Sequence, residues 1–170
     1  MAKAKSGKKS ARPTAKGVRV GILTGSPNDL EIVKKAQDTL TSLGVPCELK
    51  VLSAHRTPER VQQYVARAQE RGIEVLIACA GMANHLAGTV AAHTLIPVIG
   101  VPLSSGMPGG LDALLSTVQM PPGIPVATVG VDGAKNAGYL AARILALHDP
   151  AVRDALERDL NEQRKRYDSV

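Results

Sequence analysis

The chain has 170 residues, enough for one domain of ordinary size with its own hydrophobic core. It contains no Phe or Trp and only three Tyr, which argues against a surface that binds nucleic-acid bases by stacking them on aromatic rings. The net charge of +6 comes from residues 1–17, which hold six of the 21 basic residues and none of the 15 acidic ones. We expect residues 1–17 to form a disordered basic tail and residues 18–170 to form a single, formally neutral α/β domain that binds no nucleic acid.

Neither export nor membrane insertion is indicated by the sequence. The tail has no apolar run that could serve as the hydrophobic segment of a signal peptide, and no later stretch is long and apolar enough to span a bilayer. Cys47 and Cys79 lie in apolar segments without metal-ligand spacing, so we expect free thiols in a reducing compartment. The sequence therefore predicts a cytoplasmic protein that contacts no membrane.

Apolar, β-rich runs alternate along the chain with stretches whose apolar residues recur at helical spacing. Gly and Pro punctuate the changes from one to the other. We expect strands at residues 18–24, 47–52, 74–80, 96–101 and 125–129. We expect helices at residues 30–43, 58–71, 85–93, 111–118, 134–147 and 150–166. This alternation predicts a three-layer α/β fold with a parallel five-stranded sheet, in the flavodoxin-like order 2-1-3-4-5, and an additional C-terminal helix.

The turn after the second predicted strand concentrates polar chemistry. Its sequence, Ser53-Ala54-His55-Arg56-Thr57-Pro58, joins a titratable imidazole to a permanent cation whose planar fork matches phosphate oxygens. Ligands of open parallel sheets bind outside the carboxyl ends of the strands, where this turn is expected to lie. The alternative is that Ser53 or Thr57 only caps a helix.

The turns after the first and third strands are expected to lie beside it. Ser26 and Asn28 offer hydrogen-bond donors at a helix N-terminus, where an anion is favoured, and Asp29 can accept hydrogen bonds from sugar hydroxyls. This combination suggests a ribose 5-phosphate, although an ordinary Asn/Asp helix cap has the same residues. His85 in the third turn is either a second donor to the ligand or a helix cap.

Several other kinds of site lack support. Four scattered His residues, with no acid spaced to join them, argue against a metal site, and we interpret His93 and His148 as structural. The first turn is neither a phosphate-binding Walker loop nor a dinucleotide-binding GxGxxG loop. A non-catalytic flavodoxin-like nucleotide-binding or signalling module stays open, but Asp29 is the only acid in the first three turns, whereas a receiver domain needs an acidic cluster.

Five motifs together resemble the PurE family, the bacterial N5-carboxyaminoimidazole ribonucleotide mutases of purine biosynthesis. The resemblance covers about residues 18–166, in order and without large gaps. The motifs are Gly25-Ser26-Pro27-Asn28-Asp29, Ser53-Ala54-His55-Arg56-Thr57-Pro58, Gly81-Met82-Ala83-Asn84-His85-Leu86-Ala87-Gly88, residues 110–121 (GLDALLSTVQMP) and Ala134-Lys135-Asn136-Ala137.

This resemblance implies an isomerase without cofactor or metal, which moves a carboxylate from the exocyclic nitrogen of the ribonucleotide to carbon 4 of its ring. It also implies a homo-octamer with sites at subunit contacts. His55 would move protons. Independently of the resemblance, the Gly-rich loop 104–110 is suited to be a lid over the site. The implied substrate-binding residues are Ser26, Asn28 and Arg56 for the phosphate, Asp29 for the ribose, and Ser53, Ala54, Gly81, Met82, His85 and Leu86 for the base and carboxylate.

The chain departs from the family's usual pattern at three positions. Asn28 stands where Ser is usual, and Met82 and Ala87 interrupt a third turn that commonly reads Gly-Gly-Ala-Ala-His-Leu-Pro. The alternative enzyme is the animal-type relative, which carboxylates aminoimidazole ribonucleotide directly with carbon dioxide. Those relatives typically have Lys in place of Arg56 and lack His85, so both residues favour the mutase.

Overall fold

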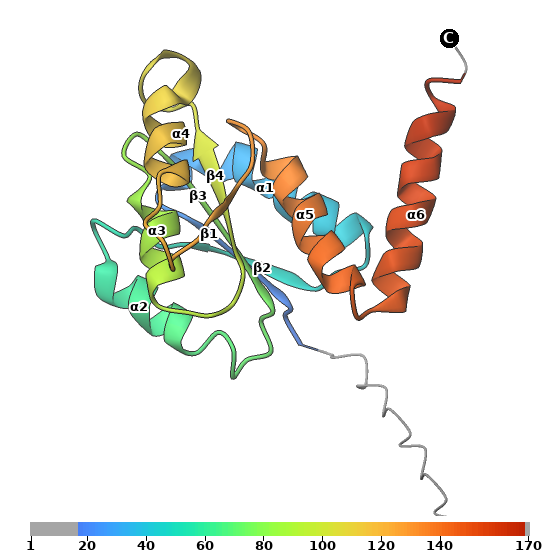
Figure 1. The fold of residues 1–170 in the computed structure, drawn as a ribbon, viewed down its shortest axis with the longest axis horizontal. Helices are drawn as coiled ribbons and strands as arrows, with labels where there is room; N and C mark the ends of the chain where they lie inside the picture. Colours follow the sequence, from blue (N-terminus) through green and yellow to red (C-terminus); the bar gives the residue numbers. More distant parts are fainter. Residues whose placement is uncertain (1–16, 169–170) are drawn as a thin grey trace, which may run out of the picture.

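The computed structural model describes residues 17–168, and the predicted basic tail lies almost wholly outside them. Five parallel strands form one sheet in the order β2-β1-β3-β4-β5, as predicted (Figure 1). The strands are β1 (Val20–Thr24), β2 (Cys47–Val51), β3 (Val75–Gly81), β4 (Val98–Leu103) and β5 (Ala127–Thr128). The helices are α1 (Leu30–Ser42), α2 (Pro58–Ala66), α3 (His85–Ala92), α4 (Leu111–Val118), α5 (Ala134–Ala146) and α6 (Pro150–Lys165), with short 3-10 helices η1 (Pro27–Asp29) and η2 (Pro108–Gly110).

The central strands are buried on both faces because helices cover both sides of the sheet. Along β3, the side chains of Val75 and Ile77 enter one hydrophobic cluster, whereas those of Leu76 and Ala78 enter another. Helices α1 and α5 supply the first cluster, and α2 and α3 supply the second. The near-continuous apolar sequence of β3 is thus explained by its burial on both faces of the sheet, as expected for a central parallel strand.

Helices α1 and α5 pack with their backbones unusually close together. A Cβ atom added to Gly138 of α5 would lie 2.9 Å from the carbonyl oxygen of Ala36 in α1 and 3.0 Å from the Cβ atom of Thr39. Ala137 and Ala141 of α5 are fully buried in the same cluster. A chain without Phe or Trp fills this side of the core by close approach of small residues rather than by large rings.

Strand β4 extends farther than the sequence pattern predicts. We expected Pro102 to end it, but the strand continues to Leu103. The carbonyl of Pro102 points toward the β5 side, where it accepts a hydrogen bond from the backbone N–H of Asp132 (2.9 Å). Because β5 pairs only with Ile99 and Gly100, the missing N–H of Pro102 removes no bond between strands.

Two elements are shortened more than the others, although β1 also begins late, at Val20 instead of residue 18, and β4 begins at Val98 instead of residue 96. Strand β5 is limited to Ala127–Thr128 instead of 125–129, and Pro125 has no N–H to contribute to the ladder. Helix α2 ends at Ala66, and residues 67–72 continue as turns to Gly72, whose φ of 85° favours glycine. Both differences lie away from the turns that carry the candidate site.

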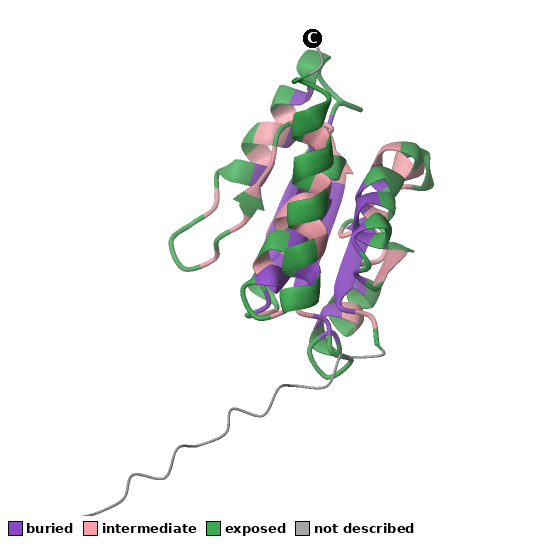
Figure 2. Ribbon diagram, turned by 90° about the vertical axis from the view of Figure 1, so that its right-hand side faces the viewer, coloured by how far each residue is buried: buried purple, intermediate pink, exposed green. Residues whose placement is uncertain are grey.

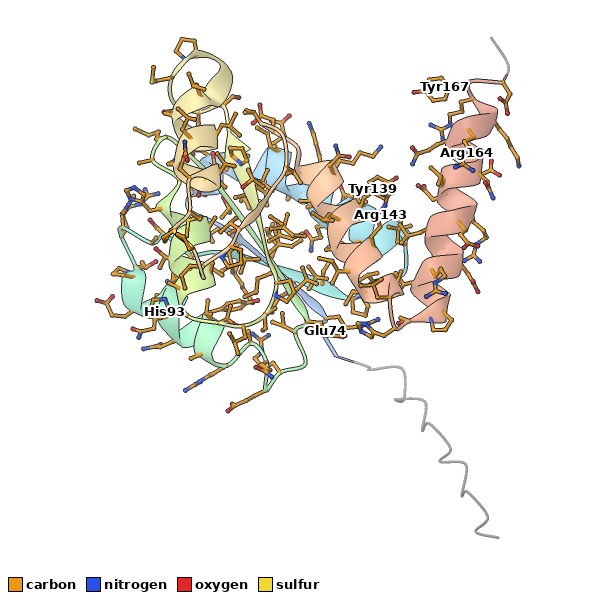
Figure 3. The ribbon with its side chains drawn as sticks, in the orientation of Figure 1. Glu74, His93, Tyr139, Arg143, Arg164 and Tyr167 are labelled. Carbon is orange, nitrogen blue, oxygen red and sulfur yellow. The ribbon has the colours of Figure 1, made fainter. Side chains whose placement is uncertain are left out.

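Helix α6 stands at the side of the molecule and is mostly exposed (Figures 1 and 2). It rests on α5, where the hydroxyl of Tyr139 donates to Asp159 Oδ2 (2.8 Å) and Gln163 Nε2 donates to the same carboxylate (2.6 Å). Figure 3 shows Tyr139 and Arg143 on the side of α5 that faces α6. Asp149 caps the start of α6 by accepting the N–H groups of Ala151 and Val152.

A buried arginine ties the start of α6 to the amino ends of the strands. Arg19, 8% exposed, donates from Nε to Glu74 Oε1 (2.7 Å) and from Nη1 to Asp149 Oδ2 (2.5 Å). His148 contacts the other oxygen of Glu74 through Nε2 (2.6 Å), so this histidine has the structural role that the sequence suggested. The network lies at the edge of the sheet opposite the candidate site.

Candidate active site

The turns after β1, β2 and β3 meet at one edge of the sheet. Thr24, the last residue of β1, is in register with Val51 of β2 and with Cys79 of β3, so the three strands end side by side. Arg56 Nη2 in the second turn donates to the carbonyl oxygen of Gly25 in the first (2.7 Å). His55 in the second turn contacts His85 in the third. Residues that are far apart in the sequence are thus in direct contact.

The first turn is built around η1. Ser26 is its N-cap residue, and its hydroxyl accepts the N–H of Asn28 (3.2 Å), whereas Asp29, the N-cap residue of α1, makes no side-chain cap bond of the kind considered from the sequence. Asp29 is half-buried. Burial raises the pKa of its carboxyl, while a hydrogen bond from Thr24 and the positive charge of Arg56 act in the opposite direction. Burial outweighs both, so the pKa of the Asp29 carboxyl is raised above its usual value.

The second turn is held by its own hydroxyl groups. Thr57 Oγ1 accepts the N–H of Ser53 (3.0 Å) and donates to its carbonyl oxygen (3.1 Å), but makes no cap bond to α2. Ser53 Oγ accepts from the backbone N–H of Arg56 (3.2 Å) and from its Nε (3.4 Å). These bonds close a compact loop that leaves the side chains of His55 and Arg56 exposed at its rim, with Ala54 half-buried beneath.

His55 and His85 form a hydrogen-bonded pair of imidazoles. His55 Nε2 lies 2.7 Å from His85 Nδ1, and the rings meet edge to face with centroids 4.9 Å apart. One nitrogen must donate and the other accept, so a single proton lies between the rings and the tautomers of the two side chains are linked. Both rings are exposed, which leaves His55 Nδ1 and His85 Nε2 accessible to a ligand.

The third turn passes close to the loop that follows β4. A Cβ atom added to Gly81 would lie 1.8 Å from Ser105 Oγ and 3.2 Å from the carbonyl oxygen of Leu103, so no larger residue fits without displacing this loop. Met82 has a left-handed φ of 54° and a side chain that is 64% exposed. The side chain of Leu86 is buried in the core, so it can offer a ligand only its backbone N–H at the start of α3.

The loop after β4 is attached to a residue that the sequence reasoning missed. Asp132, in the turn after β5, accepts from the backbone N–H of Ser104 (3.0 Å) and from its hydroxyl (2.6 Å). Asp112 accepts the N–H of Met107 at the other end of the loop (3.1 Å). Asp132 follows a strand just as His55 does, so the rule that sites gather at the carboxyl ends of strands could have identified it.

Within residues 17–168, no three His, Cys, Asp or Glu side chains converge as the ligands of a metal ion would. Burial raises the pKa of the thiols of Cys47 and Cys79, so neither offers a ready thiolate. No helix of these residues is long and apolar enough to cross a membrane.

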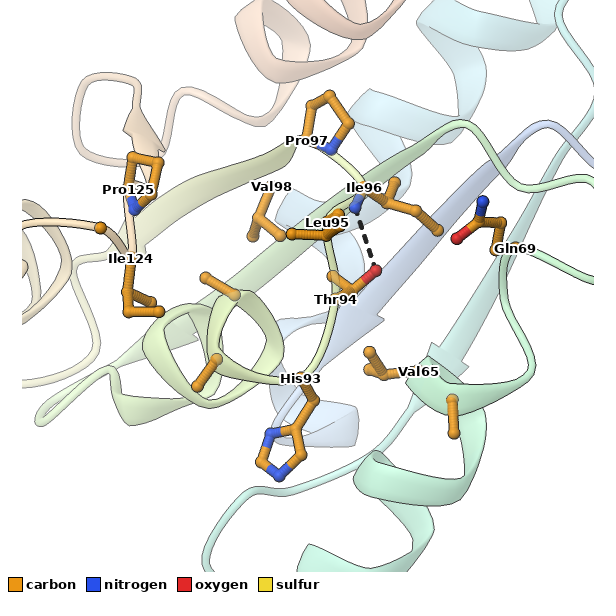
Figure 4. Close-up of a pocket in the computed structure, with 14 residues that line it drawn as sticks. Val65, Gln69, His93, Thr94, Leu95, Ile96, Pro97, Val98, Ile124 and Pro125 are labelled. Atoms are coloured by element: carbon orange, nitrogen blue, oxygen red, sulfur yellow. Dashed lines mark hydrogen bonds between the residues drawn. The ribbon is translucent and has the colours of Figure 1, made fainter.

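A groove of the molecule lies away from these turns. It has a volume of about 820 Å³ and contains none of the predicted site residues (Figure 4). Leu95, Ile96 and Pro97, at the amino end of β4, line it together with the end of α3, and Thr94 Oγ1 accepts the N–H of Ile96 there (3.0 Å). His93 lies at its rim, where its Nδ1 contacts the carbonyl oxygen of Thr89 (2.8 Å). Most of the residues that line it are apolar, and Gln69, His93 and Thr94 are its polar side chains.

Known proteins resemble this chain over most of its length. The family described as AIR carboxylase matches residues 19–166. The N5-carboxyaminoimidazole ribonucleotide mutase of Pyrococcus abyssi is 54% identical over 147 residues, which cover 86% of this chain and 84% of that protein. The mutase of the same name from Bacillus subtilis is 53% identical over 148 residues, covering 86% and 89%.

Solved structures agree with the fold. A crystal structure of Treponema denticola PurE aligns with a TM-score of 0.78 at 29% identity, covering 88% of this chain and 94% of that one. A substituted form of Treponema denticola PurE2 aligns with a TM-score of 0.82 at 28% identity, covering 90% and 95%.

Proposed function

Because this chain belongs to the AIR carboxylase family, we propose that it is an N5-carboxyaminoimidazole ribonucleotide mutase of purine biosynthesis. The observation that carries the proposal is the identity of 54% with a relative of that name, over 86% of the chain. The enzyme is an isomerase that produces 4-carboxy-5-aminoimidazole ribonucleotide. The pairing of His55 with His85, beside the cation of Arg56, supplies groups suited to this chemistry.

The reaction needs one proton to be delivered and one to be removed. Protonation of the exocyclic nitrogen breaks its bond to the carboxylate carbon, which releases carbon dioxide and leaves the aminoimidazole. Carbon 4 of the ring then attacks the carbon dioxide and briefly carries both a hydrogen and the new carboxylate. Removal of that hydrogen as a proton restores the aromatic ring. One imidazole can act as the acid in the first half and as the base in the second, so that its proton is returned.

We assign this proton transfer to His55. Its ring is exposed at the rim of the second turn, and His85 fixes its orientation and tautomer through the 2.7 Å hydrogen bond between the two rings. Carbon dioxide must stay beside carbon 4 until the new bond forms. The loop 104–110, attached through Asp132 and adjacent to Gly81, is suited to close over it.

The remaining site residues bind the substrate in this proposal. Arg56 uses Nε and Nη2 on Ser53 and Gly25, so its other guanidinium nitrogen can reach the phosphate together with Ser26 and Asn28. Asp29 accepts hydrogen bonds from the ribose. The base and carboxylate lie against the polar turns and backbone groups of Ser53, Ala54, Gly81, Met82, His85 and Leu86.

Two reactions test this function. Purified protein is incubated with N5-carboxyaminoimidazole ribonucleotide, and separately with aminoimidazole ribonucleotide plus bicarbonate, while the ring-carboxylated product is measured by chromatography. We expect rapid turnover of the first substrate. Preference for the second would make the protein a direct carboxylase, and turnover of neither would leave a non-catalytic nucleotide-binding module.

We also propose that the enzyme is a homo-oligomer, an octamer by resemblance to its family. The support is a row of apolar side chains on the outer face of α4, where Leu111, Leu115 and Val118 are 50%, 46% and 49% exposed. A second copy of the chain would cover such a face. Light scattering should give an octamer for the wild type and a smaller species for Leu115→Glu, whereas Gln62→Glu on the exposed face of α2 should leave the assembly intact.

A cytoplasmic location is part of the same proposal. Its support is that Cys47 and Cys79 are both free thiols, which a reducing compartment preserves. Cell fractionation with an antibody against the chain would test it.

A further inference from the structure

The turn that carries His85 is fastened to α4 by hydrogen bonds from Asn84. The backbone N–H of Asn84 donates to Ser116 Oγ (2.9 Å), and its side-chain Nδ2 donates to Thr117 Oγ1 (2.9 Å). Both acceptors are themselves fixed, since Ser116 donates to the carbonyl oxygen of Asp112 (2.7 Å) and Thr117 to that of Ala113 (2.6 Å). The residue before His85 is thus joined to one helix at two points.

The orientation of the Asn84 amide follows from its neighbours. The hydrogen of the Thr117 hydroxyl is used on Ala113, and the second neighbour of Nδ2, at 3.4 Å, is the carbonyl oxygen of Val101. Both neighbours therefore accept hydrogen bonds, which requires the NH2 group and not the oxygen to face them. The amide is a donor to β4 and α4 at the same time.

This arrangement is not what Asn usually does at the start of a helix. Asn84 is the N-cap residue of α3, yet its side chain makes no cap bond. It is fully buried, and its Oδ1 has no hydrogen-bond partner among the described residues. A buried carbonyl without a hydrogen-bond partner lowers stability. Asn84 therefore does not stabilise the protein as a helix cap would, and we explain its position by the conformation that it imposes on the turn.

The rest of the turn is equally constrained. Met82 holds a left-handed backbone that costs a non-glycine residue free energy and persists only where the surroundings fix it. The ring of His85, by contrast, is exposed, and within residues 17–168 its only hydrogen bond is to His55. The position of that ring consequently depends on the backbone that Asn84 anchors.

We propose that Asn84, Ser116 and Thr117 are positioning residues, which hold the turn to α4 so that His85 Nδ1 stays within hydrogen-bonding distance of His55 Nε2. The proposal rests on the proposed function for its kinetic consequence but not for its geometry. Loosening this attachment should displace the His85 ring while leaving the phosphate-binding turns unchanged. Turnover should fall more than substrate affinity.

The main variant is Thr117→Val, which keeps the shape of the side chain and removes the acceptor for Asn84. A misplacement on the order of 1 Å can cost about 100-fold in rate, so we expect kcat to fall about 10- to 100-fold with KM within about twofold. Thr117→Ser keeps the hydroxyl and should restore kcat to near the wild-type value.

Thr39→Val is the matched control. Thr39 is also buried and also donates to the carbonyl oxygen four residues earlier, that of Lys35 (2.7 Å), but it lies on α1 away from the turn. The Thr39→Val variant should lose about as much thermal stability as Thr117→Val does, and it should retain the wild-type kcat. An unchanged kcat in folded Thr117→Val, or equal losses of kcat in the two Val variants, would overturn the proposal.

A second variant and a second measurement keep the proposal testable if Thr117→Val fails to fold. If Thr117→Val does not fold, Ser116→Ala removes the other acceptor and should lower kcat in the same way. Nitrogen-15 NMR of the histidine rings detects the bond between His55 and His85 without any substrate, and it should weaken in both variants. An inactive wild type would refute the proposed function, whereas an unchanged ring signal in the variants would refute the positioning role alone.

Discussion

Replacement of Arg19 by Met should be among the most destabilising single changes in this protein, although it lies far from the candidate site. Arg19 is 8% exposed, and its guanidinium bonds two carboxylates, at 2.7 Å to Glu74 and at 2.5 Å to Asp149. Met keeps much of the volume but leaves both carboxylates without their main partner. Breaking a buried ion pair costs about 3–5 kcal/mol.

Partial exposure of the partners reduces this figure. The side chains of Glu74 and Asp149 are 29% and 19% exposed, and Glu74 keeps its contact with His148. We therefore expect a loss of about 2–4 kcal/mol at neutral pH. In a domain of this size that corresponds to a fall in melting temperature of about 5–15 °C, measured by far-UV circular dichroism because the chain has no Trp.

The effect should depend on pH in a defined direction. Burial tends to raise the pKa of both carboxyls, but hydrogen bonds to Arg19, to His148 for Glu74 and to backbone N–H groups for Asp149 outweigh it, so both pKa values are lowered on folding. A lowered pKa stabilises the fold above the unfolded value of about 4 and loses that contribution as the pH falls through the folded value. The difference between wild type and Arg19→Met should therefore be full at pH 6 and shrink below about pH 4.

Arg71→Met is the control for this prediction. Arg71 also bonds a carboxylate, that of Glu48, but its side chain is 39% exposed, so its loss should cost less than about 1 kcal/mol. If Arg19→Met were no less stable than Arg71→Met, or if its deficit did not change between pH 6 and pH 3, the account of this network would be wrong.

Three further variants test the site. His55→Asn should bind the nucleotide and unfold normally while kcat falls at least about 100- to 10,000-fold, because general acid-base catalysis is lost; kcat near wild type would remove His55 from the mechanism. Gly81→Ala places a Cβ atom 1.8 Å from Ser105 Oγ. Because Ser105 is exposed and can move aside, we expect a clear loss of turnover with little change in melting temperature. A lowered melting temperature with unchanged turnover would show that Gly81 serves packing alone. Asp132→Asn weakens the two bonds to Ser104, so KM should rise about tenfold, the loss expected for one charge-assisted hydrogen bond, and an unchanged KM would separate this loop from substrate binding.

The sheet and its order were predictable because they depend on patterns that repeat along the chain. Apolar runs that end in Gly, Ser or Pro indicated the five strands, and the right-handed connection of parallel strands left few possible orders. The contact between His55 and His85, 30 residues apart, follows from the same rule once the turns after β2 and β3 are placed at one edge.

What could not be predicted depends on contacts between distant segments. Asn84 is a residue type that caps helices, and only the position of Thr117, 33 residues later, explains why its amide turns to α4 instead. The motif predicts Leu86 as a site residue, and only the fold shows that its side chain lies in the core and leaves its backbone N–H as the group it can offer. Pro102 suggests a strand end unless one knows that its missing N–H faces the side where β5 has already stopped.

The close packing of α1 against α5 fixes the distance between two acidic residues of the candidate site. Helix α1 begins directly after Asp29, and α5 begins two residues after Asp132, so both carboxylates are mounted on the same pair of helices. Because Gly138 packs directly against the backbone of Ala36, there is no space for a larger side chain between these two helices. A larger side chain at Gly138 would push the two helices apart, and it would widen the gap between the two carboxylates, which lie about 10 Å from this contact at about 1.5 Å per helical residue.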